Sequence, residues 1–378
     1  MSSSLYDSKL YIEDLKTAIE HTLSKEKLQG ITVLVTGASG TIGSFIVDML
    51  CEYGVRVIAC GRNVEKLRHS FSRYVDLVDF CNLDILDDSS FDNLPDKQVD
   101  YIIHAAGNAY PSAFIDHTDE TVRGNICGTA RLLEYGKKHG CMCFVYVSSG
   151  EVYSLDEEYR QQWAERVPEL FSSNKLSKDK LQSLFEDVQS DVKERGPRSC
   201  YPVSKAATEA MTLAAGAFES DQMKTIVVRP CHTFGPGITG SDDRAHVQFA
   251  KKAVAGEDIV LNSAGTQLRS YNYVADAASG IVSAMLFSDD NKSDKERIFD
   301  ICSKDNVITI KGLAELIAKE TGVSVVIKEA DERQKSLQSP INKQVLNSEN
   351  LENIGWEKAF DLETGISHYL QILKETTV

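Results

Sequence analysis

Short runs of apolar residues alternate with amphipathic stretches along most of this chain. From residue 31, the segment ITVLVTG predicts a strand, ASGTIGSFIVDMLCEYG a glycine turn and a helix, and VRVIACG a second strand. Further runs rich in Val and Ile lie at 99–106, 143–148 and 225–229, with helical stretches between them. Continuous apolar runs of this length are typical of parallel strands that are buried on both faces. The pattern therefore predicts an α/β fold with a doubly wound parallel sheet.

The two ends of the chain depart from this alternation. Residues 5–28 carry apolar positions at helical spacing, which predicts an amphipathic leader helix. The chain after residue 235 predicts a helix near 245–255, strands near 258–262 and 298–301, and helices near 310–321 and 361–374. We therefore expect a leader at 1–29, a sheet domain at 30–235 to which later segments can contribute, and a smaller α/β lid at 236–378. The lid would lie beside the carboxyl edge of the sheet, where open α/β sheets bind ligands.

The turn after the first predicted strand carries three glycines at three-residue spacing. Glycines at such a turn allow a tight bend, close approach of the backbone to a pyrophosphate and close packing of helix on strand, while the helix N-terminus supplies amide donors. In this strand–turn–helix setting the loop predicts a Rossmann fold that binds NAD or NADP. The residues expected to contact the dinucleotide here are Gly37, Ser39, Gly40, Thr41, Ile42 and Gly43.

The end of the second strand bears on the choice between the two dinucleotides. An acidic residue there would bind the ribose 2′-hydroxyl of NAD, but this strand is followed by Gly61 and Arg62. A guanidinium suits a 2′-phosphate, so Arg62 favours NADP. The alternative is that Arg62 stacks on the adenine or faces solvent and that NAD still binds. Asp84, after the third strand-like run, is a candidate partner for the adenine amino group or a helix cap.

A tyrosine and a lysine one helical turn apart predict a catalytic pair. Tyr201 and Lys205 share a face of the helix that begins near residue 200. A phenol titrates at about 10, so it can act as a base near neutrality only beside a cation, which Lys205 and an oxidised nicotinamide can provide. Ser149, at the end of the strand before it, would bind the substrate hydroxyl. Together these three residues predict oxidation or reduction of a sugar-like hydroxyl.

Composition limits the other function classes. The net charge of −15 disfavours a nucleic-acid partner, because no basic patch offsets it. Nine cysteines are scattered without CxxC pairs or histidines at zinc spacing, so we expect reduced core thiols in a cytoplasmic protein and no metal site. No apolar run is long enough to span a membrane, and no signal peptide is visible, so we expect no membrane role.

Several motifs in a fixed order resemble the extended branch of the short-chain dehydrogenase/reductase superfamily, which contains nucleotide-sugar epimerases, dehydratases and decarboxylases. The resemblance runs from about residue 31 to residue 373. Besides the glycine loop and the Tyr201–Lys205 pair, the motifs are His104–Gly107, Asn125 with Gly128 and Thr129, Ser148–Tyr153, Arg229 with Pro230, Phe234–Gly237, Arg269 with Tyr273–Asp276, and Ile354–Trp356.

The resemblance implies further residue roles and partners. It implies a nucleoside-diphosphate sugar as substrate, with the diphosphate held in the lid, and a homodimer formed through the helices that carry Asn125 and Tyr201. The further cofactor contacts that it implies are Arg62, Asp84, Ile85, Ala105, Ala106, Gly107, Asn125, Lys205 and Arg229. The substrate contacts that it implies are Ser149, Gly150, Glu151, His232, Thr233, Arg244 and Arg269. His232 and its neighbour Cys231 have strand-end packing as an equal alternative, and an ion pair at the surface is the alternative for Arg269 and Arg244.

The reaction that the family performs begins with oxidation of the sugar at C4, with the hydride passing to the nicotinamide and the proton to Tyr201. In 4,6-dehydratases an acid follows the catalytic Ser or Thr and protonates the leaving hydroxyl, and here Gly150 stands in its place. Glu151 is retained, as in UDP-glucuronate decarboxylases, and can serve as a base or orient the sugar ring. Neither a decarboxylase nor a 4-epimerase needs an acid at position 150. We therefore expect a UDP-glucuronate-type decarboxylase first and a 4-epimerase second.

Three other readings stay open. Arg62 would suit a net 4-keto-sugar reductase, which exchanges NADPH at every turnover. A 4,6-dehydratase is disfavoured by Gly150. A non-catalytic dinucleotide sensor on the same fold is disfavoured by the intact catalytic set, since a sensor has no use for a poised phenol.

The separation of Ser149 and Tyr201 is roughly twice what the family commonly shows. The additional stretch, about 156–198, is charged and predicts helices. Long insertions are often functional, so this one can cover the sugar pocket or bind a partner, with a solvated helical excursion as the alternative. Its Arg160, Arg166 and Arg198 are candidates to bind a substrate carboxylate, although ion pairs on a helix surface explain them equally well.

Overall fold

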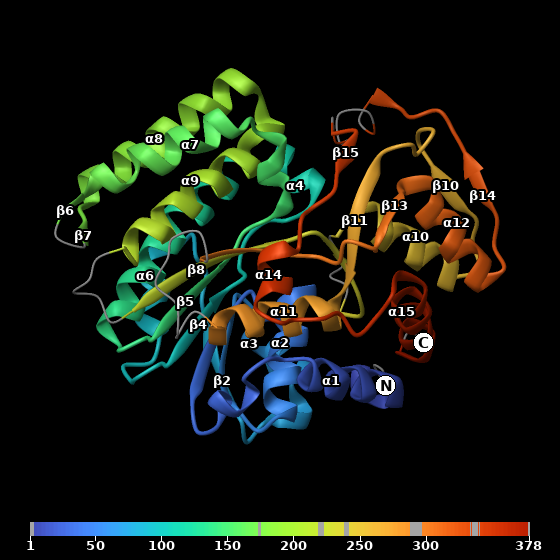
Figure 1. The fold of residues 1–378 in the computed structure, drawn as a ribbon, viewed down its shortest axis with the longest axis horizontal. Helices are drawn as coiled ribbons and strands as arrows, with labels where there is room; N and C mark the ends of the chain where they lie inside the picture. The colour runs from blue at the N-terminus through green and yellow to red at the C-terminus, as the bar shows by residue number, and fades with distance from the viewer. Residues whose placement is uncertain are drawn as a thin grey trace.

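A parallel sheet of seven strands forms the centre of the molecule (Figure 1). The computed structural model describes residues 4–172, 175–217, 223–237, 242–287, 297–332, 334, 339 and 341–376. The strand order is β12-β8-β5-β4-β1-β2-β3, and every pair is parallel. The strands are β1 Thr32–Thr36, β2 Arg56–Gly61, β3 Val78–Asn82, β4 Tyr101–His104, β5 Cys143–Val147, β8 Lys224–Pro230 and β12 Ile298–Ile301. The predicted doubly wound α/β fold is confirmed.

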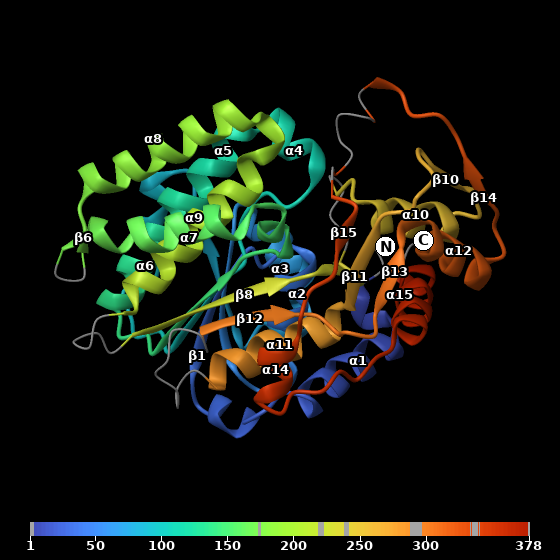
Figure 2. The same ribbon diagram turned by 45° about the horizontal axis from the view of Figure 1, so that its top comes forward.

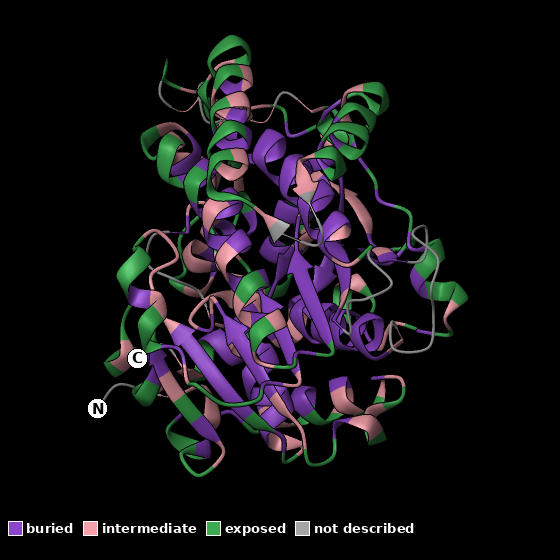
Figure 3. Ribbon diagram, turned by 90° about the vertical axis from the view of Figure 1, so that its left-hand side faces the viewer, coloured by how far each residue is buried: buried purple, intermediate pink, exposed green. Residues whose placement is uncertain are grey.

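The sheet is covered on both faces, which explains why its inner strands are buried and mostly apolar (Figure 3). Val33 and Val35 of β1 point into one core, and Leu34 between them points into the other. The first core is shared with α2 Thr41–Glu52, α3 Val64–Ser70 and α11 Val274–Phe287. The second is shared with α4 Pro111–Asp116, α5 Thr118–Arg123, η5 Gly124–Gly128, α6 Thr129–Lys138 and α9 Cys200–Ala215.

The leader region folds onto the first of these layers. It contains η1 Leu5–Asp7, α1 Lys9–Glu20 and η2 Lys25–Leu28. Tyr6 and Tyr11 each donate a hydrogen bond of 2.5 Å to the buried carboxylate of Asp48 in α2. Asp14 of α1 accepts a bond of 2.6 Å from Tyr273. The leader is therefore fixed both to α2 and to the carboxyl-terminal part of the chain.

A smaller lobe lies beside the sheet (Figure 2). Its central strand is β11 Leu268–Tyr273, which pairs with β9 His232–Phe234, β13 Val307–Thr309 and β15 Lys343–Gln344. Around it lie α10 Ala245–Val254, β10 Ile259–Leu261, α12 Ile310–Thr321, β14 Val325–Ile327 and α15 Leu362–Thr376. Helix α14 Glu349–Asn353 packs instead against β12 of the central sheet. The strand expected in the lid near 298–301 is instead β12, whose Phe299 and Ile301 are buried in the core shared with α11 and the central sheet.

The inserted segment forms a pair of helices on the outer side of α9 (Figures 1 and 2). It consists of α7 Glu157–Arg166, η7 Pro168–Leu170, β6 Phe171–Ser172, β7 Lys175–Leu176, α8 Lys178–Arg195 and η8 Pro197–Ser199. Helix α8 packs against α5, η5 and α9 and buries four apolar side chains, Leu184, Phe185, Val188 and Val192. Asn125 lies in η5 and Tyr201 in α9. The surface through which a homodimer was expected is therefore covered by α8 of the same chain, and pairing of two copies stays a prediction.

Within the described ranges, no helix combines the length and the apolar character that crossing a bilayer requires.

Candidate active site

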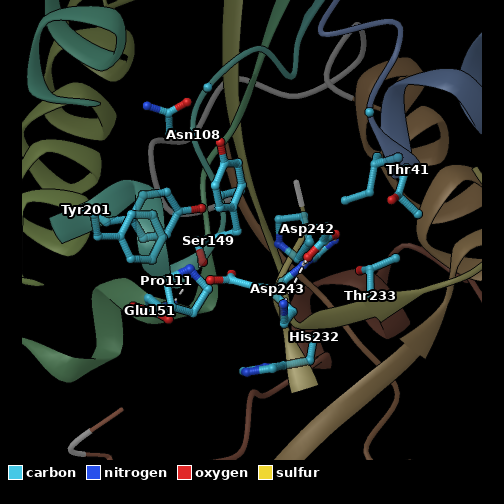
Figure 4. Close-up of a pocket in the computed structure, with 18 of the residues that line it drawn as sticks. Thr41, Asn108, Pro111, Ser149, Glu151, Tyr201, His232, Thr233, Asp242 and Asp243 are labelled. Atoms are coloured by element: carbon cyan, nitrogen blue, oxygen red, sulfur yellow. Dashed lines mark hydrogen bonds and ion pairs between the residues drawn. The ribbon is translucent and has the colours of Figure 1, made fainter. Parts of the chain in front are cut away.

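One cavity of about 760 Å³ opens at the carboxyl ends of the central strands and extends into the smaller lobe. It begins where β1 and β4 lie side by side, which is the point at which the strand order reverses. Figure 4 shows Tyr201 and Glu151 on one side of this cavity, with Ser149 beside them, and Thr41 and Thr233 on the other. The cavity therefore contains residues from both the predicted cofactor site and the predicted substrate site.

The glycine loop is packed too closely to carry side chains. Gly37 has φ +67°, and a Cβ there would lie 2.6 Å from the carbonyl oxygen of Ala105. A Cβ on Gly43 would lie 2.3 Å from the carbonyl oxygen of Gly37. Helix α2 starts after Gly40 without a side-chain cap from any described residue, so amides of its first turn are left for a ligand. The loop thus fits the pyrophosphate of a dinucleotide. All six residues expected to contact the dinucleotide here border the cavity.

A buried histidine ties the two strand ends that flank this loop. His104 Nδ1 lies 2.7 Å from Thr36 Oγ1, and His104 Nε2 lies 3.0 Å from Thr129 Oγ1. Thr36 Oγ1 also accepts a bond of 3.2 Å from the amide of Ala106. Burial, followed by the nearby charge of Lys205, lowers the pKa of His104 to about 3, so the ring is neutral. This contact places Ala105, Ala106 and Gly107 at the cavity wall.

The far end of the cofactor half is lined by residues that follow β2 and β3. Arg62 is exposed and borders the cavity together with Lys66, a second cation that the sequence reasoning missed. Asp84 and Ile85 also border it. One carboxylate oxygen of Asp84 accepts a bond of 3.0 Å from the amide of Leu86, so the side chain shapes its own turn while facing the cavity.

The three predicted catalytic side chains meet in this cavity. Ser149 lies beside Tyr201 in this cavity (Figure 4), and its hydroxyl lowers the pKa of the phenol against the larger raising effect of burial. Lys205 lies one turn further along α9, with its Nζ 5.7 Å from the centre of the Tyr201 ring and 2.8 Å from the carbonyl oxygen of Val147. Burial raises the pKa of Tyr201 to about 12 and lowers that of Lys205 to about 7. Tyr201 is therefore protonated here, and it needs added positive charge to become a base.

An aromatic ring and an arginine complete the wall around Tyr201. The ring of Phe114 stacks on Tyr201 with centroids 4.4 Å apart and planes at 20°. The Arg198 guanidinium lies 4.7 Å from the centre of the Phe114 ring. Its Nη2 donates to both oxygens of Glu151, at 2.9 and 3.0 Å. The insertion thus supplies an arginine to the active site, and neither the pairing nor the role of Phe114 was predicted.

Gly150 is covered by a leucine from the segment after β15. A Cβ at Gly150 would lie 2.8 Å from both methyl carbons of Leu346. Gly150 therefore lines the cavity through its backbone, and the space that an acidic side chain would need is occupied by Leu346.

The lobe side of the cavity is rich in cations. Arg269 is 3% exposed, and its donors reach the carbonyl oxygens of Leu268 at 2.9 Å and Ile341 at 2.6 Å. No described carboxylate forms an ion pair with it. Arg244 is paired with Asp242 through a contact of 2.5 Å. Because a buried guanidinium without a counter-ion is costly, Arg269 marks a place for an anion.

His232 and Thr233 also lie at this wall. Burial and then the charges of Arg269, Arg244 and Arg198 lower the pKa of His232 to about 3, so its ring is neutral. The His232 ring meets the ring of Tyr271 edge-on, with centroids 5.5 Å apart. Both His232 and Thr233 border the cavity.

Two predicted cofactor residues do not reach the cavity. Arg229 does not border it and binds Glu209 through Nε at 3.0 Å and Nη2 at 2.6 Å. The role of Arg229 as a cofactor contact is therefore corrected to that of a buried ion-pair partner. Asn125 is buried in η5 and donates a bond of 2.8 Å to Ser204 Oγ, so it supports α9 rather than the cofactor surface. Their motifs are recognisable in the sequence, but a motif does not tell which way a side chain points.

Comparison with known proteins places the chain in a family. Residues 33–302 match the model of the NAD dependent epimerase/dehydratase family. Among curated relatives, UDP-glucuronic acid decarboxylase 1 of Xenopus tropicalis is 24% identical over 344 residues, which cover 90% of this chain and 72% of the relative. UDP-glucuronic acid decarboxylase 1 of Arabidopsis thaliana is 25% identical over 341 residues, covering 89% of this chain and 68% of the relative.

Solved structures share the fold. UDP-glucose 4-epimerase from Thermotoga maritima, determined with UDP-glucose, has a TM-score of 0.67 at 22% identity and covers 92% of this chain and 100% of its own. MoeE5 in complex with UDP-glucuronic acid and NAD has a TM-score of 0.64 at 21% identity and covers 91% of this chain and 99% of its own. Because the family model matches more than half of the sequence, this protein belongs to the NAD dependent epimerase/dehydratase family.

Proposed function

We propose that this protein oxidises the sugar of a nucleoside diphosphate sugar at C4 and then decarboxylates it, with a UDP-glucuronate-type substrate. The observation that carries the proposal is that the glycine loop, Ser149, Tyr201, Lys205 and the Glu151–Arg198 pair border one cavity. The names of the relatives, UDP-glucuronic acid decarboxylases, support the same reaction.

In the oxidation step, Tyr201 takes the proton of the C4 hydroxyl. Ser149 lies beside the phenol and would hold the sugar hydroxyl in line with it. The Lys205 ammonium stabilises the phenolate that accepts the proton. A dinucleotide bound along the glycine loop supplies the hydride acceptor. The loop, Asp84, Ala105, Ala106, Gly107 and Lys205 would hold it.

Decarboxylation fits the surroundings of Gly150. After C4 is oxidised, a carboxylate on C5 belongs to a β-keto acid, which loses carbon dioxide without a proton donor at position 150. A 4,6-dehydratase needs that donor, and Leu346 fills the space that its side chain would take. The local packing therefore supports decarboxylation over dehydration.

Arg198 is placed to recognise a carboxylate. Both of its hydrogen bonds to Glu151 come from Nη2, and its Nε is buried with no partner among the described residues. A guanidinium carries five N–H donors, so Arg198 has donors to offer a second anion. Arg269, which has no carboxylate partner among the described residues, would bind the diphosphate. Two anionic groups on one substrate match these two arginines.

A 4-epimerase is the second candidate. Like the decarboxylase, it is redox-neutral overall and needs no acid at position 150.

A net 4-keto-sugar reductase is favoured by a different observation. Arg62 and Lys66 both border the end of the cavity where the adenosine ribose would lie, and two cations there suit the 2′-phosphate of NADPH.

Mass spectrometry of products distinguishes these reactions. The purified protein is incubated with UDP-glucuronate, UDP-glucose and dTDP-glucose, with NAD or NADP added. Loss of carbon dioxide from UDP-glucuronate is the expected result. A new isomer without mass change would mean an epimerase, and loss of water a dehydratase. Steady NADPH consumption that occurs only with a 4-keto sugar would select the reductase.

A further inference from the structure

A buried carboxylate outside the cavity is connected to the catalytic residues. Glu209 lies on α9 one turn beyond Lys205 and is 5% exposed. It accepts hydrogen bonds from Ser148 Oγ at 2.5 Å, Arg229 Nε at 3.0 Å and Arg229 Nη2 at 2.6 Å. Neither Glu209 nor Arg229 borders the cavity. Any effect of this ion pair on the reaction must therefore pass through its neighbours.

The first neighbour is the segment that carries Ser149. Ser148, held by Glu209, directly precedes Ser149. The residue before it, Val147, accepts the Lys205 Nζ bond of 2.8 Å. Two successive turns of α9 thus hold the end of β5 at two successive residues. This fixes where Ser149 leaves the strand.

The second neighbour lies at the other end of the same segment. The 3₁₀ turn η6 Gly150–Ser154 carries Glu151 and Tyr153. Arg229 Nη1 donates a bond of 2.9 Å to the Tyr153 hydroxyl, which in turn donates to Asp300 at 2.9 Å. The Glu209–Arg229 ion pair therefore holds the segment 148–153 by two hydrogen bonds, one from Ser148 to the Glu209 carboxylate and one from the Arg229 guanidinium to Tyr153. Ser149 and Glu151 lie between these two hydrogen-bonded residues.

We propose that the buried Glu209–Arg229 ion pair is a positioning element for catalysis, which holds the segment 148–153 at both ends so that Ser149 and Glu151 face the sugar. The inference rests on the proposed roles of Ser149, Tyr201 and Lys205. It goes beyond them because it assigns a catalytic effect to two residues that touch neither cofactor nor substrate.

The ion pair also acts on Lys205 by charge. The titratable groups around Lys205 are Tyr201 and Glu209 of its own helix, Tyr146 of β5 and His104 of β4. His104 is neutral because its pKa is about 3, and burial raises the pKa of Tyr146 far above its usual value. Glu209 is thus the carboxylate that opposes the burial of Lys205 and raises its pKa. Without that charge, Lys205 loses its proton at a lower pH.

The test compares Glu209→Gln with the double variant Glu209→Gln/Arg229→Met. The single variant leaves a buried guanidinium without its carboxylate partner and is expected to be less stable, whereas the double variant removes both charges of the pair and should recover most of that stability. If the pair only stabilises the fold, the double variant should also recover activity. We expect instead that it folds, binds dinucleotide with unchanged affinity, and has a kcat lower by about 10- to 100-fold with KM little changed, because misplaced catalytic groups cost about that much.

The pH profile supplies a second readout. In both variants the alkaline limit of kcat should move to lower pH, because Lys205 has lost the charge that keeps it protonated. Tyr153→Phe removes the hydrogen bond between Arg229 and Tyr153 and leaves Glu209 in place. It should lower kcat without moving that alkaline limit. A stable double variant with wild-type kcat and an unchanged alkaline limit would overturn the inference. Failure of the proposed catalytic set is recognised separately, because Tyr201→Phe would then retain turnover.

Discussion

The carboxylate of Glu151 and the guanidinium of Arg198 form an ion pair at 2.9 and 3.0 Å, in which Glu151 precedes the inserted segment and Arg198 is its last residue. The insertion packs its apolar side chains on α5, η5 and α9, which brings its last residues back to the cavity. It therefore contributes a charged group to the site and is not only a helical excursion over the surface.

Arg198 should set the preference for an anionic sugar. In Arg198→Lys the planar guanidinium with its several N–H donors is lost but the charge is kept, and in Arg198→Met both are lost. We expect the kcat/KM for UDP-glucuronate to fall by about 10-fold or more in the lysine variant and further in the methionine variant, since charged hydrogen bonds contribute about 1.5–3 kcal/mol each. Binding of UDP-glucose should change much less. Equal losses for the two ligands, measured by calorimetry and steady-state kinetics, would argue against carboxylate recognition.

Arg166 offers a matched control for Arg198. It lies in the same insertion and is paired with Asp187 on the surface, away from the cavity. Arg166→Met should leave the kinetics with both sugars as in the wild type, because exposed ion pairs contribute little.

An aspartate at position 150 should not create a dehydratase. In Gly150→Asp the new side chain has to displace Leu346, which we expect to lower the free energy of unfolding by about 1–3 kcal/mol. The paired variant Gly150→Asp/Leu346→Ala provides space for the acid. Denaturant unfolding and product mass spectrometry measure the two effects. Efficient loss of water from dTDP-glucose by the single variant would show that Leu346 does not block the acid.

The carboxylate under the leader helix should make stability depend on pH. Burial raises the pKa of Asp48 to about 7, against the lowering effect of its bonds from Tyr11 and Tyr6. A carboxyl whose pKa is raised on folding stabilises the protein when protonated, and this contribution is lost as pH rises from about 4 to about 7. Relative to Asp48→Asn, the wild type should therefore lose stability over that range. Parallel curves of Tm against pH for the two proteins would contradict the assigned pKa.

Local patterns predicted the parts of the molecule that depend on neighbours in sequence. The glycine loop forms because Gly37 and Gly43 permit a backbone approach that no side chain allows, and the Tyr201–Lys205 face follows from helical periodicity. Strand β12 was expected in the lid because its four residues do not indicate which strand they pair with, and its partner proved to be β8 of the central sheet.

The remaining site residues depend on contacts between distant segments. Arg198 reaches Glu151 only because α8 folds back over α9, and Phe114 meets Tyr201 from a separate helix. Arg229 was expected at the cofactor because its motif is recognisable, yet its side chain lies on the Glu209 side of β8. Glu209, one helical turn after Lys205, was the available sequence signal for the Glu209–Arg229 pair. The sheet order is needed to show that β8, which carries Arg229, lies next to it.

The most direct test of the account is a single-turnover measurement on Tyr201→Phe. The variant and the wild type are loaded with NAD and mixed with UDP-glucuronate, while absorbance of the reduced nicotinamide is followed and dinucleotide affinity is measured separately. We predict near-normal dinucleotide binding and no detectable nicotinamide reduction in the variant, because the C4 hydroxyl has lost its base. Retention of wild-type reduction and turnover by Tyr201→Phe would contradict the central claim.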